Sequence, residues 1–176
     1  DLVCELGCED DRCLIVGICD DSPRSTPTIV ISQDFEDGIY PWYAESGLWA
    51  GGVPTAVGPS ACYSGNQCAG TVLGGNYPNN TDSRLVSPSF TLPTVIGGEE
   101  IHLRFWQWFE RGDAEDWGRV EIKTWDPADG WSDWIPVGRQ MWWTSPAWSR
   151  VSQDVTAFSG QTVQVGLMHA SGGYYS

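Results

Sequence analysis

A strict alternation of side-chain character over residues 101–110, IHLRFWQWFE, constrains the fold of this chain more than any other feature. One set of alternate positions is apolar apart from Gln107, and it consists of Ile101, Leu103, Phe105 and Phe109. The other set combines aromatic and ionisable side chains, namely His102, Arg104, Trp106, Trp108 and Glu110. A period of two is that of a β-strand with one face on a core. We therefore expect a half-buried strand here.

The second face of this strand has two interpretations. Two tryptophans beside three ionisable groups are unusual for a face that only meets water. The face either packs under a second layer or loop, or forms a binding surface. The sequence alone leaves both open.

Composition places the chain among all-β proteins. It holds 11 Trp and 21 Gly but only two Met in 176 residues. Aromatic and β-branched residues favour pleated surfaces, and Gly, Pro, Asn and Asp favour the turns between them. Many short strands with turns every ~8–12 residues are typical of a β-sandwich.

The net charge of −14 excludes several partners. Phosphate binding needs clustered Lys and Arg, so we expect no nucleic acid partner. No apolar run approaches the ~18 residues of a membrane span, so we expect no membrane insertion. The chain opens on acidic residues without a signal peptide, which we interpret as a mature or excised chain of a secreted or cell-surface protein.

The cysteines predict disulfides and an oxidising compartment. Six are present, and they are Cys4, Cys8, Cys13, Cys19, Cys62 and Cys68. The first four allow three pairings, and the last two would close one tight loop. A zinc site is disfavoured because the N-terminal spacing lacks CxxC pairs and no histidine lies nearby.

The chain divides into three parts in this interpretation. Residues 1–19 form a short disulfide-rich segment, residues 20–29 a Pro/Ser/Thr linker, and residues 30–176 the sandwich of roughly nine strands. Residues 119–125 alternate like residues 101–110. We hypothesise that these two strands pair through the acidic turn between them, so that their outward rows merge into one face.

Catalytic motifs are missing. The carboxylate pairs Glu110–Asp113 and Glu115–Asp116 lie in an acidic turn, where solvated side chains are expected. His169 follows apolar residues at a period of two, which predicts an inward, hydrogen-bonded core histidine. Neither GxSxG nor HExxH is present. We expect no enzyme activity from this chain.

Recognition of a glycan or of a cell-surface protein is the favoured hypothesis. Flat aromatic rings stack on sugars, and neighbouring polar groups add directional hydrogen bonds. The candidate ligand-binding residues are Trp106, Trp108, Trp125, Trp142, Trp143 and Arg104.

An ordered set of segments resembles one known family. These segments are DFEDG (34–38), GPSACYSGNQCAGT (58–71), NYPNNTDSRLVSPSFTL (76–92), IHLRFWQWFE (101–110), VEIKTWDPADGWSDWIPV (120–137) and WSRVSQDVTAFSGQTVQVGLMHAS (148–171). In this order they resemble the MAM domain and the MAM-like jelly-roll modules of secreted bacterial proteins. The resemblance implies an antiparallel jelly-roll β-sandwich used for adhesion or as an accessory module.

The resemblance also implies a structural cation. Glu36 and Asp82 match the positions of its ligands, and a hard cation such as calcium takes several oxygen ligands of this kind. The alternatives are a surface carboxylate for Glu36 and, for Asp82, a turn cap.

The chain departs from the family at its end. The family pattern continues into a further strand with paired aspartates, whereas this chain stops at GGYYS. That strand is missing, disordered or supplied by another chain, and its loss would leave an open sheet edge able to form a homo-oligomer. Two alternative functions follow: an accessory domain of a larger secreted hydrolase such as a metallopeptidase, or a self-assembling surface structural protein.

Overall fold

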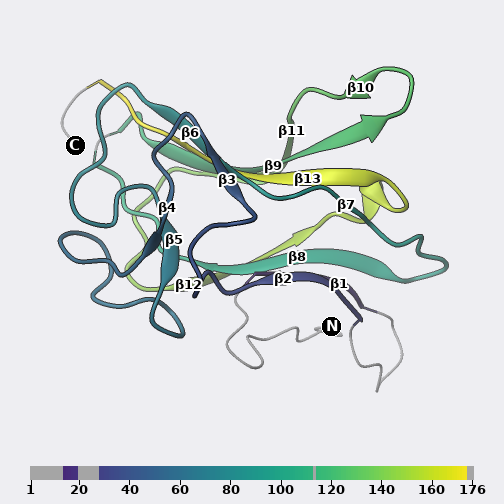
Figure 1. Ribbon diagram of the computed structural model, residues 1–176, viewed down its shortest axis with the longest axis horizontal. Helices are drawn as coiled ribbons and strands as arrows, with labels where there is room; N and C mark the ends of the chain where they lie inside the picture. Colours follow the sequence, from purple (N-terminus) through teal and green to yellow (C-terminus); the bar gives the residue numbers. More distant parts are fainter. Residues whose placement is uncertain (1–13, 20–27, 113, 174–176) are drawn as a thin grey trace.

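The computed structural model describes residues 14–19, 28–112 and 114–173, and for 14–19 it describes the backbone alone. The described chain is all-β, as predicted (Figure 1). Within these described ranges, one 3-10 turn, η1 (Thr156–Phe158), interrupts the strands. The strands are β1 (Leu14–Cys19), β2 (Thr28–Gln33), β3 (Tyr43–Glu45), β4 (Ala50–Gly52), β5 (Cys68–Gly70), β6 (Asp82–Val86), β7 (Phe90–Thr91), β8 (Glu100–Gln107), β9 (Trp117–Asp126), β10 (Gly130–Trp131), β11 (Ile135–Met141), β12 (Ser149–Asp154) and β13 (Thr162–Ala170).

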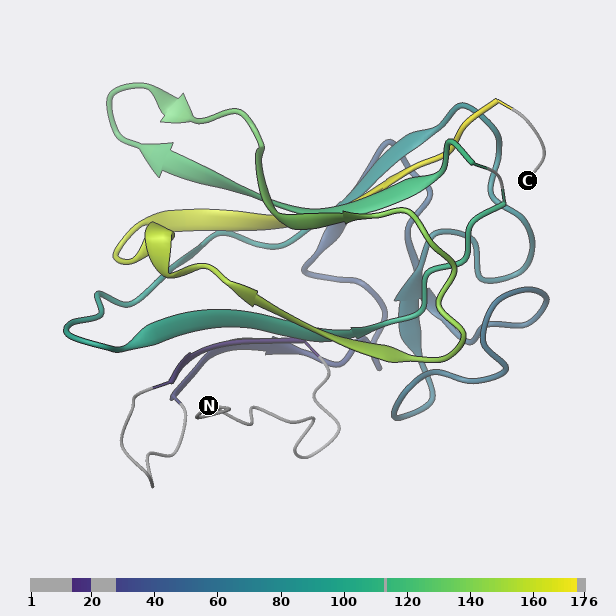
Figure 2. The same cartoon turned by 180° about the vertical axis from the view of Figure 1, so that it is seen from behind.

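Two antiparallel sheets form the layers of a sandwich (Figures 1 and 2). One has four strands in the order β12-β8-β1-β2. The other has seven, with β10-β9-β13-β6-β3 in line, β11 on β9 and β7 on β13. The short pair β4-β5 stands at one end of the layers. The predicted antiparallel β-sandwich is thus confirmed.

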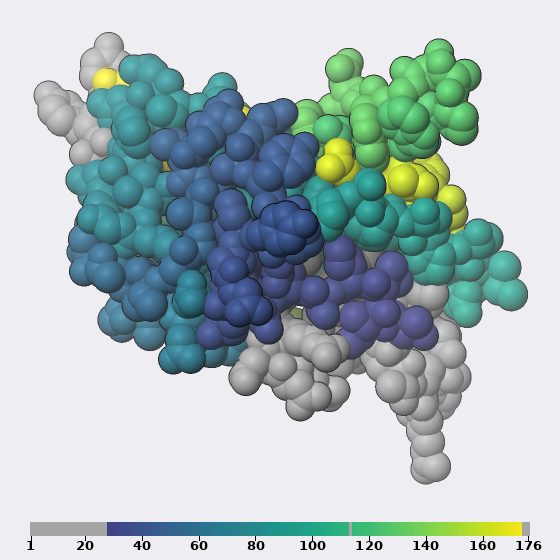
Figure 3. Space-filling model, in the orientation of Figure 1, coloured from purple at the N-terminus to yellow at the C-terminus, as the bar shows by residue number. Residues whose placement is uncertain are grey.

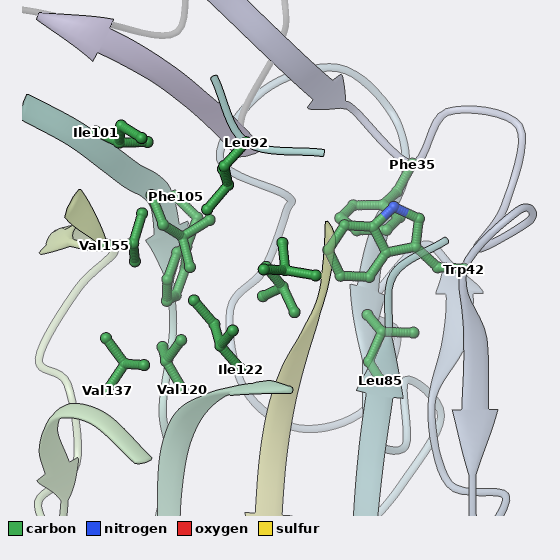
Figure 4. Packing of buried hydrophobic residues seen from close by; sticks show 13 residues of the cluster. Phe35, Trp42, Leu85, Leu92, Ile101, Phe105, Val120, Ile122, Val137 and Val155 are labelled. Atoms are coloured by element: carbon green, nitrogen blue, oxygen red, sulfur yellow. The ribbon is translucent and has the colours of Figure 1, made fainter. Parts of the chain in front are cut away.

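The core lies between the two sheets and is built from alternate residues of the central strands (Figure 4). Ile101, Leu103 and Phe105 of β8 are buried, as the alternation predicted. Facing strands contribute Ile122 and Val165. Each fully buried aliphatic side chain of this size stabilises the fold by roughly 1.5–3 kcal/mol.

The predicted pairing of the strands at 101–110 and 119–125 is wrong. β8 pairs with β1 and β12, whereas β9 pairs with β13, β10 and β11. Both edges of β8 are occupied, so the acidic turn after it crosses to the other sheet instead of closing a hairpin. The outward rows of the two strands therefore lie on opposite outer faces of the sandwich and do not merge.

Strand β1 extends the sandwich into the predicted N-terminal segment. It pairs with β2 and with β8, from Leu14↔Phe105 to Cys19↔Glu100. The predicted boundary at residue 19 therefore lies at the end of a sheet strand. Cys4, Cys8 and Cys13 lie outside the described residues, and so does the pairing predicted for them.

A buried ion cluster stiffens the outer face of the seven-stranded sheet. The carboxylate of Glu121 is 1% exposed and lies between the guanidinium groups of Arg84 and Arg119. Arg84 also packs over the ring of Trp134, 4.6 Å from its centroid. A buried carboxylate is tolerated here because both of its oxygens are paired with cations.

The β9-β10-β11 segment projects from the body of the sandwich at one end (Figures 1 and 3). No helix among the described residues is long and apolar enough to cross a membrane.

Replacing Leu103 by Ala should lower the free energy of unfolding by about 2–5 kcal/mol. The side chain is fully buried between two sheets, which cannot close over the space that the truncation leaves. Urea denaturation followed by tryptophan fluorescence measures this change. Ile135→Ala, at an exposed position, is the matched control and should cost less than about 1 kcal/mol. Equal losses in both variants would contradict the assigned core.

Candidate functional site

A cavity of about 340 Å³ lies at the end of the sandwich where β8 and β13 end. Its walls come largely from residues 105–112, from residues 167–169, and from the segment 53–77, which includes β5 and folds over this end. Figure 2 shows these loops gathered beside β4 and β5. The lining is mainly apolar and rich in aromatic rings, which is typical of sites for small organic ligands.

An aromatic cluster covers the outward face of β8 beside the cavity. Tyr63 stacks on Trp106, with ring centroids 3.8 Å apart. Trp148 meets Tyr63 and Trp108 edge to face, at 6.2 Å from each. The sequence left open whether this face packs under a loop or forms a binding surface, and the structure shows packing under a loop for Trp106. Its ring is not an open platform, because Tyr63 occupies one side.

A disulfide fixes the loop that carries Tyr63. Cys62 and Cys68 are bonded, with their Cα atoms 5.6 Å apart, which confirms the predicted pairing. The carboxylate of Glu36 binds the same loop, since its Oε1 accepts hydrogen bonds from the backbone N–H of Asn66 at 2.8 Å and of Gln67 at 2.9 Å. The loop that carries Tyr63 is therefore positioned by a disulfide and by the half-buried carboxylate of Glu36.

These contacts bear on the predicted calcium ligands. Glu36 faces N–H donors, whereas a calcium site needs oxygen ligands on every side. Asp82 begins β6 in the seven-stranded sheet, opposite Ala170. No group of three His, Cys, Asp or Glu side chains able to hold a metal ion occurs in the part of the chain that the structure describes. The described residues fit a structural role for Glu36, and calcium stays a prediction.

Asp116 departs from the expectation of a solvated carboxylate. It is 2% exposed and joins three segments. Its Oδ2 accepts hydrogen bonds from the Tyr77 hydroxyl at 2.6 Å and from the Gly112 N–H at 2.8 Å. Its Oδ1 accepts from the Gly172 N–H at 2.8 Å. Asp116 therefore anchors the acidic turn to the covering loop and to the end of the chain.

His169 is inward-facing, as predicted, and 5% exposed. The predicted hydrogen bonding is not observed, because neither ring nitrogen has a hydrogen-bond partner among the described residues. The Tyr77 ring lies edge to face at 4.5 Å and Phe109 lies at 6.1 Å. Burial lowers the pKa of His169, and the negative charges of Asp116 and Asp82 oppose this shift without reversing it.

The remaining predicted ligand residues do not converge on one place. Arg104 is 6% exposed and donates from Nε to Ser152 Oγ at 3.0 Å, so it is not available at the surface. Trp125 lies on β9, exposed, with its ring 5.4 Å from that of Trp131. These two predicted residues thus lie in different sheets.

Trp142 and Trp143 follow β11 and are 45% and 61% exposed. Arg111 Nη1 donates to the Trp142 carbonyl oxygen at 2.7 Å and ties this loop to the acidic turn. Both rings are therefore available at the surface.

A triad-like set occurs on the outer face of the four-stranded sheet. His102 Nε2 lies 2.8 Å from Glu100 Oε2, and its Nδ1 lies 3.3 Å from Ser152 Oγ. The three residues sit across β8 and β12 and are not part of the cavity lining. In the cavity, His169 contacts no described hydroxyl or thiol by a hydrogen bond. His169 is therefore not hydrogen-bonded to a described nucleophile, as the base of an acyl-transfer site would be.

Comparison with known proteins gives one informative match. The chain is 31% identical over 150 residues to Bacillopeptidase F of Bacillus subtilis (strain 168). The aligned region covers 84% of this chain and 10% of that protein, so the chain spans about a tenth of its relative's length. No family model matches, and the resemblance to MAM domains stays a prediction. None of the solved structures matches either.

Sequence reasoning missed most of the cavity. Tyr63, Tyr77 and Trp148 were not among the predicted ligand residues. The cysteines around Tyr63 were the only local pattern that pointed to an ordered loop. The alternation of side chains in β8 does not predict which loop covers the end of the strand.

Glu36→Gln should destabilise the protein equally with and without calcium, because the carboxylate holds backbone N–H groups. We expect a loss of about 1–3 kcal/mol, as for hydrogen bonds to charged groups. Thermal unfolding in 5 mM EDTA and in 5 mM CaCl2 measures it, with Asp37→Asn as control. A parent protein stabilised strongly by calcium, with the effect lost in Glu36→Gln, would instead establish the metal site.

The lowered pKa of His169 predicts acid sensitivity below neutral pH. The unfolded chain binds a proton near the ordinary histidine pKa of about 6.5, whereas the folded chain resists it. Stability is therefore complete above that pH and is lost as the pH falls through 6.5. Urea unfolding at pH 8 and pH 5.5 should show a larger loss in the parent than in His169→Leu. An equal loss in both would contradict this role.

Proposed function

We propose that this chain is a non-catalytic accessory domain of a larger extracellular peptidase. The observation that carries the proposal is the match to a segment of about a tenth of Bacillopeptidase F. Nine-tenths of that protein lies outside the matched segment. The histidine in the cavity wall, His169, is not hydrogen-bonded to a described nucleophile, which supports a role beside the catalytic part.

The disulfide and the charge support an extracellular setting. Disulfides such as Cys62–Cys68 persist in oxidising compartments and are rare in the cytosol. A net charge of −14 keeps a chain soluble and disfavours binding to nucleic acid. Both features suit a domain that works outside the cell next to a secreted enzyme.

Trp142 and Trp143 are the surface through which we propose that the domain holds a polymer, either a glycan or a protein. Their rings are the largest exposed apolar groups on one loop, and Arg111 fixes the loop backbone. Exposed tryptophans of this kind supply large contact area at little cost in conformational entropy. Recognition here would hold a substrate near an attached catalytic domain.

Trp143→Ala should weaken binding to that polymer by about fivefold or more, because truncation of a tryptophan hot spot costs over about 1 kcal/mol. Glycan arrays and pull-down with immobilised casein or cell-wall material measure binding by the purified chain. Ile96→Ala, another highly exposed apolar position, is the matched control. Binding that is absent in the parent, or unchanged in Trp143→Ala, would contradict polymer binding through this loop.

The same preparation tests the non-catalytic part. The purified chain should not hydrolyse casein above the buffer rate. Hydrolysis that persists through purification and disappears in Ser152→Ala would show that the triad-like set on the sheet is an active site.

A further inference from the structure

Polar nitrogen atoms of two side chains in the cavity wall are buried and have no hydrogen-bond partner among the described residues. One is His169, at both ring nitrogens, and the other is Trp108, at Nε1. The great majority of buried polar groups in folded proteins are paired, and leaving one unpaired is costly. Two such groups in the wall of one cavity point to a partner that arrives with a ligand.

The charges around the cavity favour a neutral ligand. The lining contains two carboxylates, Asp34 and Glu110, and two guanidinium groups, Arg111 and Arg119, so its formal charges cancel. Arg119 is already paired with Glu121. Glu110 and Arg111 are exposed at the rim. An anionic ligand would therefore find no unpaired cation inside the cavity. Of the two lining carboxylates, Glu110 lies at the rim and Asp34 already accepts a hydrogen bond from the Glu36 N–H, so a cation is not favoured either.

The unpaired nitrogen atoms of His169 and Trp108 determine which polar group a ligand needs. A neutral imidazole offers one donor and one acceptor, and an indole offers one donor. Burial keeps His169 in its neutral form near pH 7 because it lowers the pKa of the ring. A hydroxyl group satisfies either side chain, since it both donates and accepts.

The apolar walls of the cavity favour an aromatic ring as the remainder of the ligand. Phe105, Phe109 and Trp148 contribute ring surfaces to the cavity. An apolar cavity of only ~150 Å³ is enough to bind benzene, so about 340 Å³ accommodates a substituted ring. A sugar would meet mainly apolar wall surface, and each hydroxyl group left unpaired there weakens binding.

We propose that this cavity is a binding site for a phenol, a neutral aromatic ring carrying one hydroxyl group, with Trp108 Nε1 and His169 as its hydrogen-bonding partners. Two sources share this chemistry, a free phenolic compound and the tyrosine side chain of a peptide. The site is independent of the exposed pair Trp142 and Trp143, which is not part of the cavity lining.

Nuclear magnetic resonance of protein labelled with ¹⁵N at the indole nitrogens tests the proposal. The eleven tryptophans give eleven indole signals, and Trp108→Phe identifies the signal of Trp108 by its loss. Titration with 4-ethylphenol should shift that signal saturably. Ethylbenzene, which lacks the hydroxyl group, should bind about 3–10-fold more weakly.

His169→Leu separates recognition from folding. It removes a buried polar group without a described partner, so the variant should be at least as stable as the parent, yet its affinity for 4-ethylphenol should fall about 3–10-fold. Trp108→Phe, followed through the remaining indole signals, should show a similar loss. Trp125→Phe, at an exposed position outside the cavity, should bind like the parent.

The comparison of ligands identifies the source. Tighter binding of 4-ethylphenol favours a free phenol, and tighter binding of N-acetyl-L-tyrosinamide favours a tyrosine side chain; both support the site. Four results would overturn it: no saturable shift with either phenol, equal binding of ethylbenzene, unchanged affinity in both variants, or an equal shift of the Trp108 signal by methyl β-D-glucoside. None of these bears on polymer binding through Trp143, so the two proposals fail separately.

Discussion

Burial of one face of β8 against the opposite sheet is the interaction on which the rest of the structure depends. Ile101 and Leu103 are fully buried, and β8 is paired on both edges, so the strand cannot turn over or slip by one residue without exposing that face. The facing residues of β9 and β13 complete the core. This packing sends the outward row of β8 and the outward row of β9 to opposite sides of the molecule.

That separation divides the aromatic residues among distinct environments. On β8, Trp106 lies under Tyr63 beside the cavity, whereas Trp125 lies on the hairpin of the other sheet. Trp142 and Trp143 occupy an exposed loop. A chain rich in tryptophan therefore does not present one continuous aromatic face. Some rings pack, some line a cavity, and a few remain available to a large partner.

Sequence alone predicted the strand at 101–110, its buried face, the all-β class and the Cys62–Cys68 disulfide. These features are local, because a period of two and a short cysteine spacing are properties of neighbouring residues. Strand pairing is not local, since alternation specifies which side of β9 is buried and says nothing about its partner. The burial of Asp116 was missed for the same reason: its hydrogen-bond partners, Tyr77 and Gly172, are distant in the sequence.

The placement of β8 and β9 in opposite sheets is the central claim, and inter-strand nuclear Overhauser effects test it most directly. The account predicts backbone proton contacts between Phe105 and Val151, and between Ile122 and Val165, because these residues are paired across β8-β12 and β9-β13. It predicts none between the backbones of β8 and β9. A ladder of backbone contacts joining residues 101–107 to residues 119–125 would contradict the two-sheet arrangement and every site derived from it.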